Sequence, residues 1–213
     1  MRLKTRLLFG PLVAVILATG LIVLPLFIPG YDHVRQTVSE IGEVGSPMRV
    51  PFAIMLCSVA IGVLVLAFAV RDFSRALGYS LLPAYLIGAM AVSAAGVALF
   101  AHPHPLHNVF GLSELVGYQA PLALALTWRR QPQARLIVTV SWVMYILIVV
   151  AIVLNLSAPL GLDAVWTYVQ ARYGVAQRVL FGAWFGWAAI VGALLSSARY
   201  NRTPGVGRTR AEQ

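Results

Sequence analysis

The chain has 213 residues, of which 60% are hydrophobic and only 11% are charged. Soluble domains carry about 25% charged residues, so this composition excludes an ordinary soluble protein. The formal net charge is +9 at pH 7. Attraction to anionic membrane lipid explains this excess, so we expect lipid as a partner and no nucleic acid.

Six apolar blocks follow one another along the chain, each close to the ~20 residues that cross a hydrocarbon core. Backbone polar groups in lipid must be satisfied within the segment, so each block is predicted to be a helix. The blocks are 7–28, 51–70, 79–101, 109–128, 136–156 and 179–198. The sequence therefore predicts an all-α, polytopic membrane bundle of six transmembrane helices. The bundle forms one domain over 1–200, followed by a disordered cytoplasmic tail over 201–213.

Basic residues are shared unevenly between the two sets of connecting segments. If the N-terminus is placed inside, 12 of the 16 basic residues fall on the inner side. The other four, on the outer side, are Arg35, Arg49, Arg172 and Arg178. Such a bias over short loops is the positive-inside signature, so we expect both chain ends in the cytoplasm.

The first outer segment, 29–50, carries apolar residues at helical spacing, at Tyr31, Val34, Val38 and Ile41. This pattern predicts a short amphipathic helix on the membrane surface.

An acidic residue, Glu114, lies inside the fourth apolar block, seven residues after His107. An ionisable side chain in hydrocarbon costs roughly 2.5–3.5 kcal/mol on insertion scales, which makes it a candidate functional residue. Residues seven apart share one face of a helix, so His107 is expected above Glu114. All four histidines fall on the predicted outer side, where polar chemistry is therefore expected.

One interpretation of these residues is a metal site. His102, His104 and His107, together with a carboxylate, offer the nitrogen and oxygen ligands that zinc accepts. The spacing His-Pro-His-Pro-Leu-His is not a standard zinc signature.

A second interpretation is hydrolysis by nucleophilic catalysis. Ser39 or Ser113 is the candidate nucleophile, His107 the base and Glu114 the orienting acid. Each serine directly precedes a glutamate, but the chain has no Gly-x-Ser-x-Gly motif.

A third interpretation is binding or structure without chemistry. Glu114 would then pair with a cation such as Arg178, and this pair would orient helices or line a cavity. His33, Glu40 and Arg178 are the candidate ligand-binding residues.

Three stretches of the chain resemble one family. The first runs Tyr-Asp-His-Val-Arg-Gln-Thr-Val-Ser-Glu-Ile-Gly over 31–42, followed by Gly45 and a span containing Gly62. It resembles the first conserved block of the domain of unknown function 998, a family of bacterial and archaeal six-helix membrane proteins. The family's central block is similar to Leu99-Phe100 followed by Leu106-His107. Its last block is similar to the stretch from Gly174 to Arg178 with Trp184 and Trp187.

The resemblance implies the six-helix fold, and we expect the protein to be a multi-pass protein of the bacterial inner membrane. It marks Ser39, Glu40, His107 and Arg178 as family-type positions, but it implies no activity. The family often has a Phe-Pro-x-Asp turn before its histidine, whereas this chain reads Phe-Ala-His-Pro-His-Pro over 100–105. The missing aspartate weakens any mechanism that needs a carboxylate there.

We therefore predict an integral membrane protein whose outer-facing polar pocket binds a small or lipidic ligand. The alternative is a membrane-embedded, lipid-directed hydrolase that uses outer-face Ser, His and Glu residues, with or without a metal. The sequence does not identify a cofactor.

Overall fold

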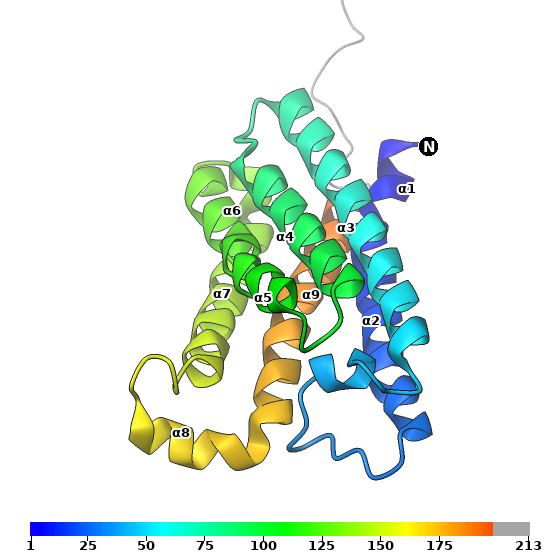
Figure 1. Cartoon of the computed structure of the whole chain (residues 1–213). Helices are drawn as coiled ribbons and strands as arrows, with labels where there is room; N and C mark the ends of the chain where they lie inside the picture. The colour runs from blue at the N-terminus through cyan, green and yellow to red at the C-terminus, as the bar shows by residue number, and fades with distance from the viewer. Residues whose placement is uncertain (198–213) are drawn as a thin grey trace, which may run out of the picture.

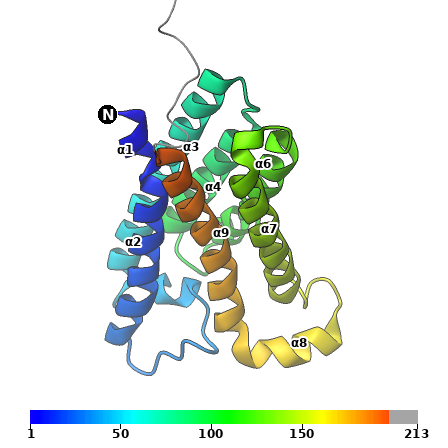
Figure 2. The same ribbon diagram turned by 180° about the vertical axis from the view of Figure 1, so that it is seen from behind.

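Helices make up all the regular structure of residues 1–197, the part of the chain that the computed structural model describes (Figures 1 and 2). Six segments of that part are long and apolar enough to cross a membrane. They are Leu3–Phe27, Arg49–Leu77, Leu82–Leu99, Pro105–Trp128, Pro132–Asn155 and Asp163–Ser196. The predicted all-α bundle of six transmembrane helices is confirmed, while the predicted tail over 201–213 lies outside the described residues.

The spans are built from nine α-helices within the described residues and short 3-10 turns between them. The α-helices are α1 (Leu3–Leu7), α2 (Phe9–Val23), α3 (Arg49–Leu77), α4 (Leu82–Leu99), α5 (Pro105–Gly117), α6 (Ala120–Trp128), α7 (Arg135–Asn155), α8 (Asp163–Val169) and α9 (Tyr173–Ser196). The 3-10 turns are η1 (Leu24–Phe27), η2 (Ser39–Gly42), η3 (Pro132–Ala134) and η4 (Gln170–Arg172).

The two ends of the bundle differ. In Figure 1 the N-terminus and the α3–α4 connection lie at one end, whereas α8 and the segment between α2 and α3 lie at the other. The loop between α4 and α5 turns back before it reaches the level of α8 (Figure 1). His102 and His104 lie on that loop.

The fourth span is broken into α5 and α6, and its break is satisfied from another helix. Pro121 has no N–H and cannot donate to the carbonyl of Gly117, four residues earlier. Trp184 Nε1 of α9 donates to that carbonyl at 3.0 Å. A proline in a span is tolerated where a neighbouring helix supplies such a donor. The span begins at Pro105, earlier than the expected 109, so His107 belongs to the helix.

The segment between α2 and α3 does not form the amphipathic helix that its apolar spacing predicts. Residues 31–38 form turns, and only Ser39–Gly42 makes a single 3-10 turn. The prediction is wrong because two backbone groups that a helix would pair with each other, the Val34 carbonyl and the Val38 N–H, are bound by α9 instead. The Val38 N–H, for example, donates to Gln177 Oε1 at 2.8 Å.

Candidate functional site

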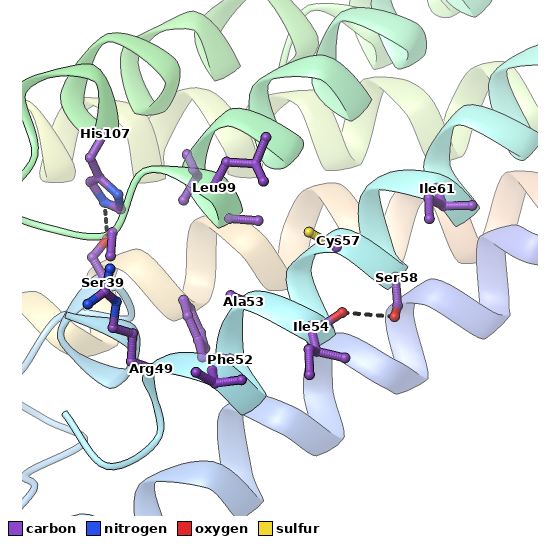
Figure 3. A pocket seen from close by; sticks show the side chains of 15 residues that line it. Ser39, Arg49, Phe52, Ala53, Ile54, Cys57, Ser58, Ile61, Leu99 and His107 are labelled. Atoms are coloured by element: carbon purple, nitrogen blue, oxygen red, sulfur yellow. Dashed lines mark hydrogen bonds between the residues drawn. The ribbon is translucent and has the colours of Figure 1, made fainter. Parts of the chain in front are cut away.

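Ser39 and His107, 68 positions apart in the chain, form a hydrogen-bonded pair. His107 Nε2 lies 2.9 Å from Ser39 Oγ, as the dashed line in Figure 3 marks. The other ring nitrogen, Nδ1, lies 2.7 Å from the backbone oxygen of Phe100. The His107 side chain is buried, with 7% of the residue exposed. The structure thus joins the predicted base to one of the two predicted nucleophiles.

The partners of His107 fix the roles of its two nitrogens. A backbone carbonyl only accepts hydrogen bonds, so Nδ1 of the neutral ring carries the proton and donates it to Phe100. Nε2 then holds the lone pair and accepts from the Ser39 hydroxyl. A serine hydroxyl facing an imidazole lone pair, with the ring oriented by a third group, is the geometry of an activated nucleophile.

The second candidate nucleophile is engaged elsewhere. Ser113 Oγ lies 2.7 Å from Ser93 Oγ and donates to the Phe110 carbonyl at 2.7 Å. Both ring nitrogens of His107 are already occupied, so Ser39 is the serine that faces the base.

The ends of α4 and α5 place His107. Pro105 opens α5, and the His104 ring caps it by accepting from the Leu106 N–H at 3.2 Å. Proline suits a first helical position, where its missing N–H costs nothing. The His102 carbonyl accepts from the Val44 N–H at 2.8 Å, which joins this corner to the segment carrying Ser39.

The first turns of α9 hold the segment that carries Ser39. Arg178 Nη1 donates to the carbonyls of His33, Gln36 and Gly174 at 3.0, 3.1 and 2.9 Å. Its Nη2 donates to the Tyr31 hydroxyl at 2.8 Å. The planar guanidinium presents five donors in a fixed fork, which suits one side chain to several carbonyls at once. Arg178 was expected to bind a ligand; in the structure its Nη donors bind this segment.

Tyr31 connects Arg178 to the residues just before Ser39. Its hydroxyl donates to the Thr37 carbonyl at 2.7 Å while accepting from Arg178. Burial raises the pKa of Tyr31, although the Arg178 hydrogen bond and charge act in the opposite direction. The phenol therefore stays protonated at neutral pH and remains a donor.

The other two predicted ligand-binding residues belong to the same segment. The Glu40 carboxylate accepts from the Thr37 hydroxyl at 2.7 Å and from the Thr37 N–H, which closes the turn before Ser39. The His33 ring lies edge-on to Tyr31, with ring centroids 5.3 Å apart.

Glu114 is buried in α5, one helical turn before Tyr118. The Tyr118 hydroxyl donates to Glu114 Oε2 at 2.9 Å. Arg178 forms no ion pair with Glu114 among the described residues, because its Nη donors bind carbonyls and Tyr31. The expected Glu114–Arg178 pair is therefore wrong. Glu114 and Ser39 instead line the same cavity.

The three histidines of the expected metal site are not gathered around a common point. The rings of His102 and His107 lie 5.7 Å apart edge-on, whereas His104 caps α5. Within residues 1–197, no group of three or more His, Cys, Asp or Glu side chains is arranged to hold a metal ion.

Two cavities meet at the Ser39–His107 pair. The first, a groove of about 420 Å³, runs between α3 and α4 (Figure 3). Its walls are mainly apolar, and Arg49 stands at its polar end, with its side chain pointing toward Ser39 in Figure 3. No carboxylate lies within ion-pair distance of Arg49 in the described part of the chain.

The second cavity, which we call the chamber, has a volume of about 440 Å³ between α5, α7 and α9. It shares Ser39, Val97 and His107 with the groove, and adds Glu114 and Asn155 to its lining. The Ser39–His107 pair is thus accessible from two sides.

Sequence reasoning missed several residues of this site. Arg49 was counted only as an outer arginine, and its approach to Ser39 depends on how the segment between α2 and α3 folds. The Phe100 carbonyl is a backbone group that no sequence pattern marks. Gln177 lies inside the stretch 174–178 that resembles the family's last block, which was the available signal.

Comparison with known proteins identifies a family for this chain. The family described as "Protein of unknown function (DUF998)" matches residues 11–194. No curated protein and no solved structure is significantly similar to the chain. The match covers four spans completely, most of the first and last spans, and both partners of the Ser39–His107 pair, so the chain belongs to the DUF998 family of proteins of unknown function.

Proposed function

We propose that this membrane protein binds a lipid or similar amphiphile in the groove and hydrolyses it, with Ser39 as nucleophile and His107 as general base. The observation that carries the proposal is the Ser39–His107 contact of 2.9 Å, with Nδ1 held by the Phe100 carbonyl. Positioned general bases contribute typically 10²–10⁴-fold to such reactions.

The reaction would proceed in two displacements. Ser39 Oγ attacks the carbonyl carbon of an ester while its proton passes to His107 Nε2. The carbon–oxygen bond to the leaving group breaks, and His107 returns the proton to the departing alkoxide. Water then attacks the acyl-serine and gives a proton to His107. The bond to Ser39 breaks, His107 returns that proton to Ser39 Oγ, and the carboxylic acid is released. The positive charge of Arg49 at the polar end of the groove favours the oxyanion formed in each step.

The groove indicates the class of ligand. Exposed apolar residues such as Ile54, Ile61 and Leu99 line its length, and a cation stands at its end. This arrangement suits an acyl chain lying along α3 with an anionic or ester group beside Arg49. The bias of basic residues predicts that this end of the bundle lies on the outer side, so the ligand would come from the outer leaflet of a bacterial inner membrane.

A serine-reactive fluorophosphonate probe and a panel of lipid esters test the proposal on purified protein in detergent. We expect labelling of Ser39 and turnover of at least one ester. Ser39→Ala should abolish labelling, and both Ser39→Ala and His107→Ala should abolish turnover. Ser113→Ala is the matched control, because its hydroxyl binds Ser93 and Phe110, and it should retain both activities. Equal labelling of wild type and Ser39→Ala would reject the assignment.

Binding without reaction is the second candidate, and the groove with its unpaired Arg49 favours it independently of the serine. In that case vesicle-derived anionic lipid should co-purify with wild type and Ser39→Ala alike, and less of it with Arg49→Gln. Mass spectrometry of the bound lipid distinguishes the two candidates. If the protein is a hydrolase, the Ser39→Ala variant should carry more intact ester than the wild type does, because the variant cannot cleave it.

A further inference from the structure

The chamber differs from the groove in the chemistry of its walls. Its polar lining includes the Glu114 carboxyl, the Asn155 amide and the Tyr173 and Gln177 side chains. Neither lysine nor arginine occurs among the described residues that line it. The Glu114 carboxyl group therefore lines this volume with no lysine or arginine of the described residues beside it.

Hydrogen-bond acceptors in the chamber exceed their protein partners. Among the described residues, Tyr118 donates to Oε2 of Glu114. Asn155 is buried and uses its amide N–H groups on the carbonyls of Ala151 and Ala176, at 2.8 and 2.9 Å. Its Oδ1 is buried with no hydrogen-bond partner in the described part of the chain. A buried acceptor without a donor is costly, so a donor from a ligand would be favourable here.

Space and aromatic surface are also present. A Cβ at Gly111, which lies on the face of α5 between His107 and Glu114, would meet nothing within 4 Å. Tyr173 and Phe181 line the same volume. Carboxylate, amide oxygen and aromatic rings together are the groups that recognise an ammonium ion.

We propose that the chamber is a binding site for a primary ammonium group, with Glu114 as counter-charge and Asn155 Oδ1 as hydrogen-bond acceptor. The ligand is then an amine-bearing amphiphile, and Ser39 lies between its amine in the chamber and the groove. The claim that this amine belongs to the molecule that Ser39 attacks rests on the proposed function. Binding of a free amine to the chamber does not depend on the proposed function.

Hexylamine is the probe, and hexanol is its uncharged match in chain length. Both are titrated calorimetrically into wild-type protein in detergent at pH 7, where the amine is protonated because alkylammonium groups have a pKa near 10.4. We expect hexylamine to bind at least about tenfold more tightly than hexanol, as a buried charge pair requires. Equal affinities would overturn the proposal without recourse to any variant.

Two variants localise the binding. Glu114→Gln should lose the preference for hexylamine, whereas Glu43→Gln, which removes a carboxylate outside the cavities, should keep it. Gly111→Leu fills the chamber and should abolish binding even if Glu114→Gln fails to fold. Gly182→Leu, at another helix position with open space around its Cβ, is the control for that change and should bind normally.

The two proposals fail separately. Fluorophosphonate labelling of Ser39 reports the proposed function, and the hexylamine titration of the same wild-type protein reports the ammonium site. Loss of labelling with retained amine preference would reject the nucleophile and leave the chamber intact. Labelling without amine preference would reject the ammonium site alone.

Discussion

Tyr31 shows how one side chain can connect a helix to the residue that would do the chemistry. Its hydroxyl accepts from Arg178 on α9 and donates to the Thr37 carbonyl, two residues before Ser39. Hydrogen bonds that involve a charged partner contribute about 1.5–3 kcal/mol, more than neutral ones do. The position of Ser39 therefore depends on a phenol that takes no part in the chemistry.

Tyr31→Phe should lower the free energy of unfolding by about 1.5–3 kcal/mol at neutral pH. It should also change the response to alkali. Burial raises the pKa of Tyr31 above its ordinary value near 10, so the folded state holds the proton that the unfolded chain releases. Wild-type stability should therefore fall as the pH rises above about 10, and this part of the fall should be absent in Tyr31→Phe.

Thermal unfolding in detergent between pH 7 and 11 measures both effects. Tyr168→Phe is the control, because that ring is 70% exposed and should behave as wild type. Parallel pH curves for wild type and Tyr31→Phe would contradict the role given to the phenol.

At the scale of elements, the first turns of α9 serve as a platform for the segment between α2 and α3. Arg178 and Gln177 supply side-chain contacts, and the Val175 N–H donates to the Val34 carbonyl at 3.3 Å. The approach is so close that a Cβ at Gly174 would collide with the carbonyls of His33 and Gln36. This packing explains why a glycine stands at that position.

Gly174→Ala should therefore displace the segment and destabilise the protein by about 1–3 kcal/mol, as overpacking does. Faster hydrogen exchange over 31–41 and weaker fluorophosphonate labelling of Ser39 are the expected readouts. Gly182→Ala introduces the same methyl group into open space on α9 and should leave both measurements unchanged. Undisturbed exchange in Gly174→Ala would show that the segment is held by other contacts.

At the scale of the whole molecule, the orientation in the membrane decides which leaflet reaches the groove. The excess of basic residues on one set of loops predicts that the α6–α7 connection faces the cytoplasm and the α7–α8 connection faces outward. The segment between α2 and α3, which carries Ser39, lies at the same end as α8 (Figure 1).

Cysteine labelling in intact cells tests this orientation. In a Cys57→Ser background, which removes the single native thiol, Leu160→Cys should react with a membrane-impermeant maleimide. Gln133→Cys, on the α6–α7 connection, should react only after the cells are permeabilised. Both positions are exposed, so accessibility of the side chain does not limit either reaction. The reverse pattern would move the proposed ligand to the inner leaflet.

The sequence by itself determined the six helices, because length and hydropathy are local properties and lipid leaves the backbone no alternative to helix. It also identified Ser39, His107, Glu114 and Arg178 as residues of interest. Tertiary structure decided which groups each of them contacts. The apolar spacing over 31–41 predicts a helix, yet α9 binds the backbone groups that the helix would need.

The pairing of Ser39 with His107, the binding of Arg178 to backbone carbonyls and the chamber beside Glu114 depend on residues far apart in the chain. The local sequence pattern shows which side chains are polar. Only packing decides which donor meets which acceptor, because the partner of a buried group is chosen by geometry and not by distance in sequence.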